Sequence, residues 1–204
     1  MPSTTAAAIA LALLAVFGLL GFGWRAWLQR RRTGSYGFHG VSGRVGSVEW
    51  TAGVGFVVAV VVAGLGPLLQ LLGIVTAWAT PEWTRLTGVA VAAAGIGLTV
   101  WSQLQMGDSW RIGVDTEETT ELVHRGVFGL VRNPIYSAML VFEFGITLLA
   151  TNPVTVIGFV LALASLELQV RRVEEPHLLA KHPAAYRDYA ATVGRFVPGV
   201  GLIR

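Results

Sequence analysis

The sequence predicts an all-α integral membrane protein, with five transmembrane helices in a single domain that covers residues 1–204. Of its 204 residues, 53% are hydrophobic and only 13% are charged, whereas soluble domains carry about 25% charged residues. Long stretches without charge alternate with short basic segments, which is the pattern of membrane helices and the loops that join them. One soluble core could not bury this much apolar surface, so a soluble fold is excluded.

The predicted helices are defined by the absence of charge. Four stretches lack charged residues, apart from Glu143 in the last: residues 1–24, 50–81, 86–107 and 133–166. Each is long enough for a membrane helix, which needs about 20 apolar residues. Asn152 and Pro153 divide the last stretch into helices of about 134–151 and 153–171, because proline cannot continue a helix. We expect this tight turn to lie at the membrane interface, where its free backbone groups meet water.

The basic residues predict the orientation in the membrane. The segments after the first, third and fifth predicted helices hold every Lys and Arg except Arg85. Cytoplasmic loops are enriched in these residues, so we expect the N-terminus outside and the C-terminus in the cytoplasm. The first helix has neither a basic start nor a small-residue cleavage site, and we therefore expect it to remain in the protein rather than to be removed as a signal peptide.

Several classes of function are disfavoured by composition. The chain has no cysteine, which excludes disulfides, thiolate metal sites and a cysteine nucleophile. Its net charge of +3 does not indicate nucleic-acid binding, because the basic residues flank membrane helices and suit anionic headgroups. No metal is predicted, since no two histidines have the i, i+4 spacing of a helical ligand pair. The four histidines are His39, His124, His177 and His182.

Glycines recur in the second and third predicted helices. Small residues let membrane helices approach closely, so we expect close packing at these positions. They are Gly53, Gly55, Gly64, Gly66, Gly95 and Gly97. Such faces could pack within one chain or between two, and the oligomeric state stays open.

Polar residues collect in two segments that the predicted topology places on the cytoplasmic side. The first connects the third and fourth helices, and the second follows the fifth helix. In the second segment Pro176 suits the first turn of a new helix. Apolar and aromatic residues then recur at three- and four-residue spacing, at Leu178, His182, Tyr186 and Tyr189. We therefore expect one amphipathic helix here, lying on the protein or on the headgroups.

Acidic residues near the membrane boundary are candidates for function. Glu167, Arg171, Glu174 and Glu175 share one face of the fifth helix, either as a salt-bridged helix end or as a working site. Glu143 follows Tyr136 by seven residues and so projects from the same face of the fourth helix. Acids inside a membrane are costly and are often functional.

The stretch "GVFGLVRNPIY", residues 126–136, stands at the start of the fourth helix. Gly126 and Gly129 permit a turn or the close approach of a ligand. Arg132 is always charged, and Pro134 begins a helix whose free N–H groups bind carboxylates. With the ring and hydroxyl of Tyr136, these features suit a ligand with an aromatic ring and both anionic and cationic groups. An interfacial loop with Arg and Tyr anchors is the alternative.

The chain resembles isoprenylcysteine carboxyl methyltransferase and its bacterial relatives. The resemblance rests on "ELVHRGVFGLVRNPIY", a helical pair through "TNP", and "EEPHLLAKHPAAYRDYAATVGRFVP", with "MGDSWR" before them. It covers about residues 98–198, and the two helices within residues 1–80 match only as generic spans. It implies an S-adenosylmethionine-dependent methyltransferase that releases S-adenosylhomocysteine. The expected location is the inner (plasma) membrane of a bacterium, with the active site facing the cytoplasm.

The resemblance also implies which residues bind the cofactor, in a pocket formed by the cytoplasmic loop and the C-terminal helix. By position they are Thr120, Glu121, Leu122, Val123, Phe128, Asn133, Pro134, Ile135, Tyr136 and Glu174, to which we add His124 and Arg132 from the same segment. Asn133 stands where the eukaryotic pattern has His, and Phe128 replaces Tyr. Both changes tolerate cofactor binding, but asparagine cannot act as a base.

Arg171 and Glu175 are the predicted catalytic residues. In the family, a catalytic arginine lies four residues before the cofactor-binding glutamate; that position here is Val170, so the neighbouring Arg171 is expected to serve. A buried Arg171 would hold the acceptor carboxylate in a bidentate contact. Glu174 and Glu175 would bind the cofactor's ammonium or ribose, and aromatic residues such as Trp110 could stack on its adenine.

The acceptor is expected to be a lipophilic membrane molecule, with the carboxylate of an isoprenoid or isoprenylcysteine-like substrate favoured. A phospholipid N-methyltransferase is the nearest alternative. It would need a base, for which His124, His182 and Glu143 are candidates. A membrane reductase would need a nicotinamide site, and no G-x-G-x-x-G loop follows a strand. A non-catalytic membrane scaffold is the third alternative.

Overall fold

The computed structural model describes residues 1–37, 40–41, 43–107, 110 and 122–203. Within these residues the chain is helical, and the one β-contact is an isolated parallel bridge between Val131 and Gly194. The predicted all-α class is confirmed. The α-helices are α1 (Ser3–Phe17), α2 (Arg25–Thr33), α3 (Val48–Leu71), α4 (Glu82–Met106), α5 (Pro134–Leu149), α6 (Pro153–Gln169), α7 (Glu175–Lys181) and α8 (Pro183–Thr192). The described residues also form two π-helical segments, η1 (Gly18–Trp24) and η4 (Val170–Glu174), and a 3-10 segment, η3 (Gly126–Gly129).

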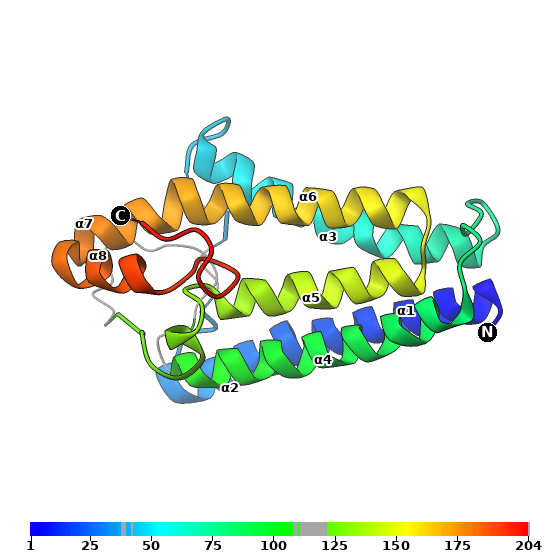
Figure 1. Cartoon of the computed structure of the whole chain (residues 1–204), viewed down its shortest axis with the longest axis horizontal. Coiled ribbons are helices and arrows are strands. Elements are labelled where there is room, and N and C mark those ends of the chain that lie inside the picture. Colours follow the sequence, from blue (N-terminus) through cyan, green and yellow to red (C-terminus); the bar gives the residue numbers. More distant parts are fainter. Residues whose placement is uncertain (38–39, 42, 108–109, 111–121, 204) are drawn as a thin grey trace.

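Four helices among the described residues are long and apolar enough to cross a membrane: Ser3–Thr33, Val48–Leu71, Glu82–Met106 and Pro153–Lys181. They run side by side with α5, with the N-terminus at one end of the bundle and the C-terminus at the other (Figure 1). α5 has 16 residues, which is about 24 Å of helix at about 1.5 Å per residue. It is therefore shorter than the roughly 30 Å apolar core of a bilayer.

Two predicted helices extend further than their uncharged stretches. The first continues through η1 and α2 to Thr33, so Arg30, Arg31 and Arg32 are helical instead of lying in a loop. The fifth continues through η4 into α7. The single amphipathic helix expected from Pro176 is wrong: α7 ends at Lys181 and α8 begins at Pro183. The reason is Pro183, which disfavours helical geometry in the residue before it and lacks a backbone donor.

Small residues bring the helices together in two pairs, α4 with α5 and α3 with α6. A Cβ atom on Gly95 would lie 2.5 Å from the backbone of Phe142, and one on Gly66 would lie 2.9 Å from the backbone nitrogen of Thr155. The predicted close packing is confirmed at both. It is wrong for Gly64 and Gly97, where a Cβ would have no described neighbour within 4 Å.

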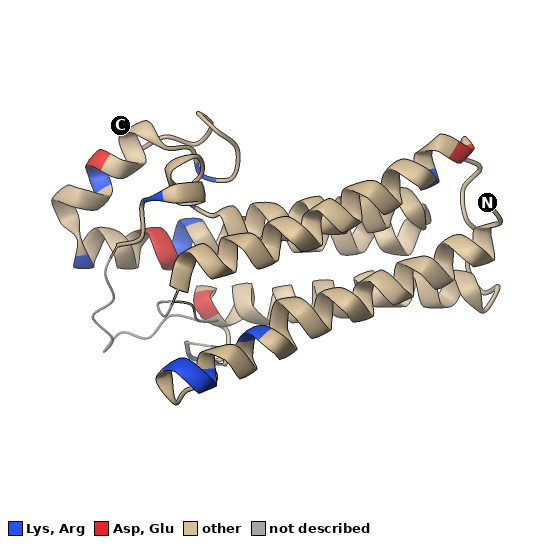
Figure 2. Ribbon diagram, turned by 90° about the horizontal axis from the view of Figure 1, so that it is seen from below, with Lys and Arg blue, Asp and Glu red and all other residues tan. Residues whose placement is uncertain are grey.

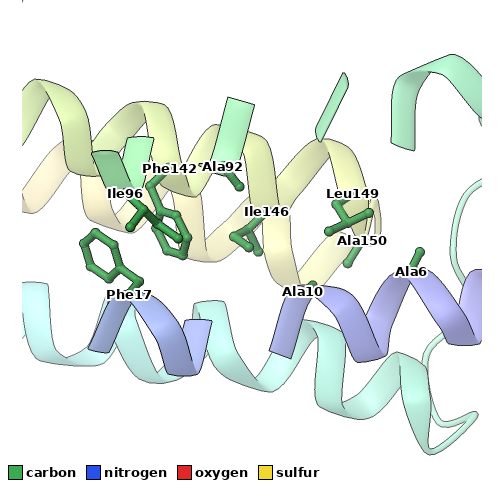
Figure 3. Close-up of a cluster of buried hydrophobic side chains, with 9 residues drawn as sticks. All are labelled: Ala6, Ala10, Phe17, Ala92, Ile96, Phe142, Ile146, Leu149 and Ala150. Atoms are coloured by element: carbon green, nitrogen blue, oxygen red, sulfur yellow. The ribbon is translucent and has the colours of Figure 1, made fainter. Parts of the chain in front are cut away.

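The apolar core lies between α1, α4 and α5 (Figure 3). The rings of Phe17 and Phe142 stack with centroids 4.2 Å apart and planes 8° from parallel. Alanines and aliphatic side chains continue the cluster towards the N-terminal end of the bundle, at Ala6, Ala10, Ala92, Ile96, Ile146, Leu149 and Ala150. This packing fixes the position of α5, whose first turn carries several predicted site residues.

The turn between α5 and α6 is as tight as predicted, but its polar groups do not meet water. Asn152 is fully buried and caps α6 by accepting from the backbone N–H groups of Val154 and Thr155. Its amide donates to Gln70 on α3 at 2.9 Å, and Gln70 donates to the Ser3 carbonyl at 2.9 Å. A capping box and a buried network therefore satisfy the turn.

Most of the charged residues lie at one end of the bundle, around α2, α7 and α8 (Figure 2). At the opposite end the amino group of Met1 pairs with Glu82 at 2.6 Å, and Arg85 donates to the Met1 carbonyl at 2.5 Å. The long apolar helices lie between these two ends (Figure 2). This separation matches the expected division into a charged aqueous end and an apolar membrane region.

Candidate functional site

A cavity of about 560 Å³ lies at the charged end of the bundle and extends along α3 and α6. Its size is within the range of about 300–1,000 Å³ that is usual for small-molecule sites. One end is bordered by polar side chains from α5, η4 and α7, and the other by apolar side chains from α3 and α5. The cavity therefore joins two chemically different compartments.

The polar end is built around Tyr136 and Glu174. The Tyr136 hydroxyl donates to Glu174 Oε1 at 2.6 Å, and the Gln169 amide approaches the same oxygen at 3.4 Å. Gln169 and Glu174 lie on either side of the first four residues of η4, and both line the cavity. π-Helical segments are rare and frequently mark functional sites. The segment brings the Gln169 amide and the Glu174 carboxylate to the wall of the cavity at which the Tyr136 hydroxyl lies.

The apolar end reaches the outer face of α3. Val57, Val60 and Val61 line the cavity, and they are 54%, 50% and 55% exposed. Exposed valines on a membrane-length helix face lipid in a bilayer. Phe56 and Met139 line the cavity more deeply. A lipophilic chain can therefore enter from the lipid side while its polar end reaches Tyr136 and Glu174.

A buried ionic cluster supports the polar end. Arg132 donates to Glu175 Oε1 at 2.7 Å, and Arg195 donates to both carboxylate oxygens of Glu175, at 2.8 and 2.9 Å. The hydrogen bond to Glu175 raises the pKa of Arg195, so Arg195 stays charged. Burial raises the pKa of Tyr186 to about 12 beside this cluster. The cluster places two cations around one anion, with Arg132 and Glu175 buried and Arg195 partly buried.

Arg132 also fixes the C-terminal segment. Its guanidinium donates to the carbonyls of Ala190 at 3.1 Å, of Gly201 at 2.9 Å, and of Val193. Its backbone N–H donates to the Gly194 carbonyl at 2.8 Å. The start of α5 is thereby tied to the chain after α8. Most of the hydrogen-bonding capacity of Arg132 is used within the protein.

Ten of the fourteen predicted site residues line the cavity. They are Leu122, Val123, Phe128, Arg132, Asn133, Pro134, Ile135, Tyr136, Glu174 and Glu175. Thr120 and Glu121 lie outside the described residues. His124 is described but does not line the cavity; its ring lies 6.3 Å from that of Tyr189.

Arg171 differs from the expectation in its burial. Its side chain is 56% exposed and pairs with Glu167 one helical turn earlier, and it does not line the cavity. The prediction that Arg171 is buried is therefore wrong. It stands at the second position of η4, between the cavity residues Gln169 and Glu174. Its position in sequence is close to the site, but its guanidinium is turned to solvent.

Several cavity residues were not singled out as site residues from the sequence. Gln169, His177 and Leu178 line the cavity, as do Tyr186 and Tyr189. The signal for Gln169 was an amide at the end of an otherwise apolar helix. The spacing of Tyr186 and Tyr189 had indicated only an amphipathic helix.

Trp110 lines the cavity too, and the sequence had suggested it as a stacking residue. The guanidinium of the buried Arg25 lies over its ring, 4.6 Å from the centroid. Arg25 also donates to the Gly107 carbonyl at 2.6 Å. The first residue of α2 is thereby fastened to the chain that leaves α4.

Comparison with known proteins gives a consistent family. A family model described as phospholipid methyltransferase matches residues 83–184, which is half of the chain. Protein-S-isoprenylcysteine O-methyltransferase B of Arabidopsis thaliana is 28% identical over 120 residues, or 58% of this chain and 61% of that protein. Its A counterpart is 32% identical over 89 residues, or 44% and 45%. The Dictyostelium discoideum enzyme of the same name is 30% identical over 79 residues, or 39% and 33%.

The matched part of the chain thus spans between a third and about three fifths of these relatives' lengths. A solved structure of the eukaryotic intramembrane Ras methyltransferase, isoprenylcysteine carboxyl methyltransferase, is similar over the whole chain. The TM-score is 0.67 with 21% identity, covering 100% of this chain and 70% of that one. At this identity the likeness establishes the fold.

Proposed function

Because the chain belongs to the phospholipid methyltransferase family, we propose that it transfers a methyl group from S-adenosylmethionine to a lipophilic acceptor that resides in the membrane. The observation that carries this proposal is that one cavity has both a polar end at Tyr136 and Glu174 and an apolar end at the exposed face of α3. A methyltransferase of membrane molecules needs this combination, since one substrate is water-soluble and the other is not.

The polar end suits the proposed cofactor, which would supply an electrophilic methyl group on a sulfonium sulfur. Glu174 offers a carboxylate to a cationic ligand, and Tyr136 holds that carboxylate through a 2.6 Å hydrogen bond. Trp110 and Phe128 offer aromatic faces to the adenine. Arg132 Nε is buried and has no hydrogen-bond partner within the described part of the chain, so it can donate to a ligand carboxylate. The residues present fit the cofactor.

We propose that a carboxylate is the methylated group. A carboxylate is already a nucleophile and needs no general base, so the protein has only to position it and exclude water. None of the three bases expected for an amine acceptor, His124, His182 and Glu143, lines this cavity. The curated relatives are named for O-methylation of isoprenylcysteine, which supports an isoprenoid or isoprenylcysteine-like carboxylate. Phospholipid N-methylation is the second candidate, favoured by the family's description.

Arg171 remains the proposed residue for orienting the acceptor carboxylate, with Glu175 in a supporting role. An exposed ion pair contributes little stability, so Arg171 can leave Glu167 at small cost. A bidentate contact to an incoming carboxylate would then replace the contact to Glu167. Glu175 acts by holding Arg132 and Arg195.

The proposed arrangement in the membrane has five spans, the N-terminus outside and the cavity's polar end in the cytoplasm of a bacterium. The antiparallel course of the helices supports five spans (Figure 1), and the gathering of charges at one end supports the orientation (Figure 2). α5 would be the fourth span in chain order, added to the four longer helices; a local thinning of the bilayer accommodates a helix this short.

The test is a methyl-transfer assay in lipid nanodiscs with methyl-labelled S-adenosylmethionine and two acceptors, N-acetyl-S-farnesylcysteine and phosphatidylethanolamine. The proposal predicts label in the farnesylcysteine product that mild base releases, because methyl esters are base-labile. Base-stable label in the phospholipid would favour the second candidate. A protein that binds S-adenosylmethionine but labels neither acceptor would contradict this choice of substrate class.

A further inference from the structure

A second cavity of about 140 Å³ lies deeper in the bundle, between α1, η1, α3, α5 and α6. It adjoins the larger cavity, because five side chains line both: Phe22, Phe56, Val60, Met139 and Leu166. A cavity of about this size holds a molecule such as benzene. Together the two cavities form one route from the charged end of the bundle into its apolar interior.

Glu143 on α5 lines this second cavity. It is 9% exposed, and its Oε1 is buried with no hydrogen-bond partner among the residues that the structure describes. Every other residue that lines the cavity is apolar or glycine. Buried polar atoms nearly always have a partner, and an acid within a membrane bundle is costly. The exception at Glu143 therefore points to a missing ligand group.

Water does not account for this carboxyl. A buried water needs about two to four polar partners, and here Glu143 is the one polar side chain of the lining. The neighbouring backbone does not help, because the Glu143 carbonyl accepts from Thr147 at 2.9 Å and the helical N–H groups are paired within α5. A polar group carried on a hydrocarbon chain fits this cavity better than water does, because the chain itself can pack against the apolar lining.

The two sites are in line along α5. Glu143 follows Tyr136 by seven residues, which is two turns and about 10 Å along the helix. Met139 lies between them on the same face and lines both cavities. Methionine is flexible and adapts to a ligand. A chain whose polar end lies at Tyr136 would thus reach Glu143 after passing Met139.

We propose that Glu143 selects the acceptor by binding a hydroxyl group carried on its hydrocarbon chain, about 10 Å from the methylated group. This inference rests on the proposed function, since it takes the methylated group to lie near Tyr136. A hydroxyl is favoured over an amine because the rest of the lining is apolar, and a hydroxyl costs less to desolvate there than an ammonium does.

The test compares octadecanoic acid with 10-hydroxyoctadecanoic acid, whose hydroxyl lies about 10 Å from the carboxylate in an extended chain at about 1.2 Å per bond. Binding of each acid is titrated calorimetrically in nanodiscs, and the ratio of the two dissociation constants is compared between variants. We expect the wild type to bind the hydroxy acid about tenfold more tightly, the effect of one buried hydrogen bond.

Three variants make the comparison specific. Glu143→Leu should abolish the preference, so that the ratio falls to about one, while Glu143→Gln should keep most of it because an amide still forms hydrogen bonds. Thr147→Val is the matched control, because Thr147 lies one turn further along α5 and lines neither cavity. This variant should prefer the hydroxy acid as strongly as the wild type does. A wild type that does not distinguish the acids, or a Leu variant that still does, would overturn the inference.

Methyl transfer on the same preparations separates this inference from the function on which it rests. A preference that depends on Glu143, together with no methyl transfer to any acceptor, would leave the subsite standing and defeat the proposed function. Methyl transfer at equal rates to both acids, in the wild type and in Glu143→Leu, would defeat the subsite and leave the proposed function standing.

Discussion

Arg132 before α5 and Glu175 at the start of α7 form a buried ion pair of 2.7 Å, and their side chains are only 1% and 7% exposed. The pair joins segments that are 43 residues apart in the sequence. Arg195 completes the contact from the C-terminal segment. The polar wall of the cavity is therefore held in place by charged side chains that pair with one another.

Glu175→Gln is predicted to destabilise the protein strongly. The change keeps the volume but leaves the buried Arg132 and the partly buried Arg195 without their counter-ion, and breaking a buried pair in this way costs about 3–5 kcal/mol. At about 2–4 °C per kcal/mol the unfolding midpoint should fall by roughly 6–20 °C. Thermal unfolding in detergent measures this.

The matched control is the neighbouring acid. Glu174→Gln should leave the unfolding midpoint nearly unchanged, because Glu174 is half-buried and the amide can still accept from Tyr136. It should weaken S-adenosylmethionine binding instead. Equal destabilisation by the two changes would show that the division between a structural and a ligand-binding glutamate is wrong.

Arg171→Ala is predicted to reduce methyl transfer by about 100-fold or more, as the loss of an orienting charge in an active site does. Binding of S-adenosylmethionine and the unfolding midpoint should both stay close to wild type, because the pair of Arg171 with Glu167 is exposed. Arg172→Ala, one residue further along the same exposed surface, should retain full activity. Equal activity of the two variants would show that Arg171 only forms a surface ion pair with Glu167 and does not orient the acceptor.

Gly95→Ala is predicted to force α4 and α5 apart. Its new Cβ would lie 2.5 Å from the Phe142 backbone, which cannot move without shifting α5. Overpacking of this kind costs about 1–3 kcal/mol, measured as a lower unfolding midpoint. Gly97→Ala lies two residues away on the open side of α4 and should be neutral or stabilising by up to about 1 kcal/mol. A similar loss in both variants would show that the contact of Gly95 with Phe142 does not cause the destabilisation.

The sequence predicted local features best. Asn152 and Pro153 mark the turn between α5 and α6, because both act through the backbone next to them. Pro183 carries an equally local signal, that a helix from Pro176 cannot continue to Tyr189, but the interpretation rested on the apolar spacing alone. The length of the uncharged stretches located the helices, though their ends extended past the charges at Arg30 and Arg171.

Long-range partners could not be read from the sequence. Arg132 was assigned to the cofactor by its neighbours in the chain, yet its main partners, Glu175 and Ala190, come from segments that fold against it later in the sequence. The contact of Arg171 with Glu167 is local, and the sequence had offered it as the salt-bridged helix end. The role of Arg132 depends on burial and on partners distant in the sequence, and neither is visible in a linear motif.

The most direct test of the proposed function is a calorimetric titration of the purified protein with S-adenosylmethionine and S-adenosylhomocysteine, with Tyr136→Phe and Glu174→Ala beside the wild type. We predict micromolar binding to the wild type, about tenfold weaker binding to Tyr136→Phe through loss of one hydrogen bond to a charged group, and no measurable binding to Glu174→Ala. A correctly folded wild type that binds neither compound would contradict the methyltransferase assignment and would favour a membrane scaffold that keeps the family's architecture.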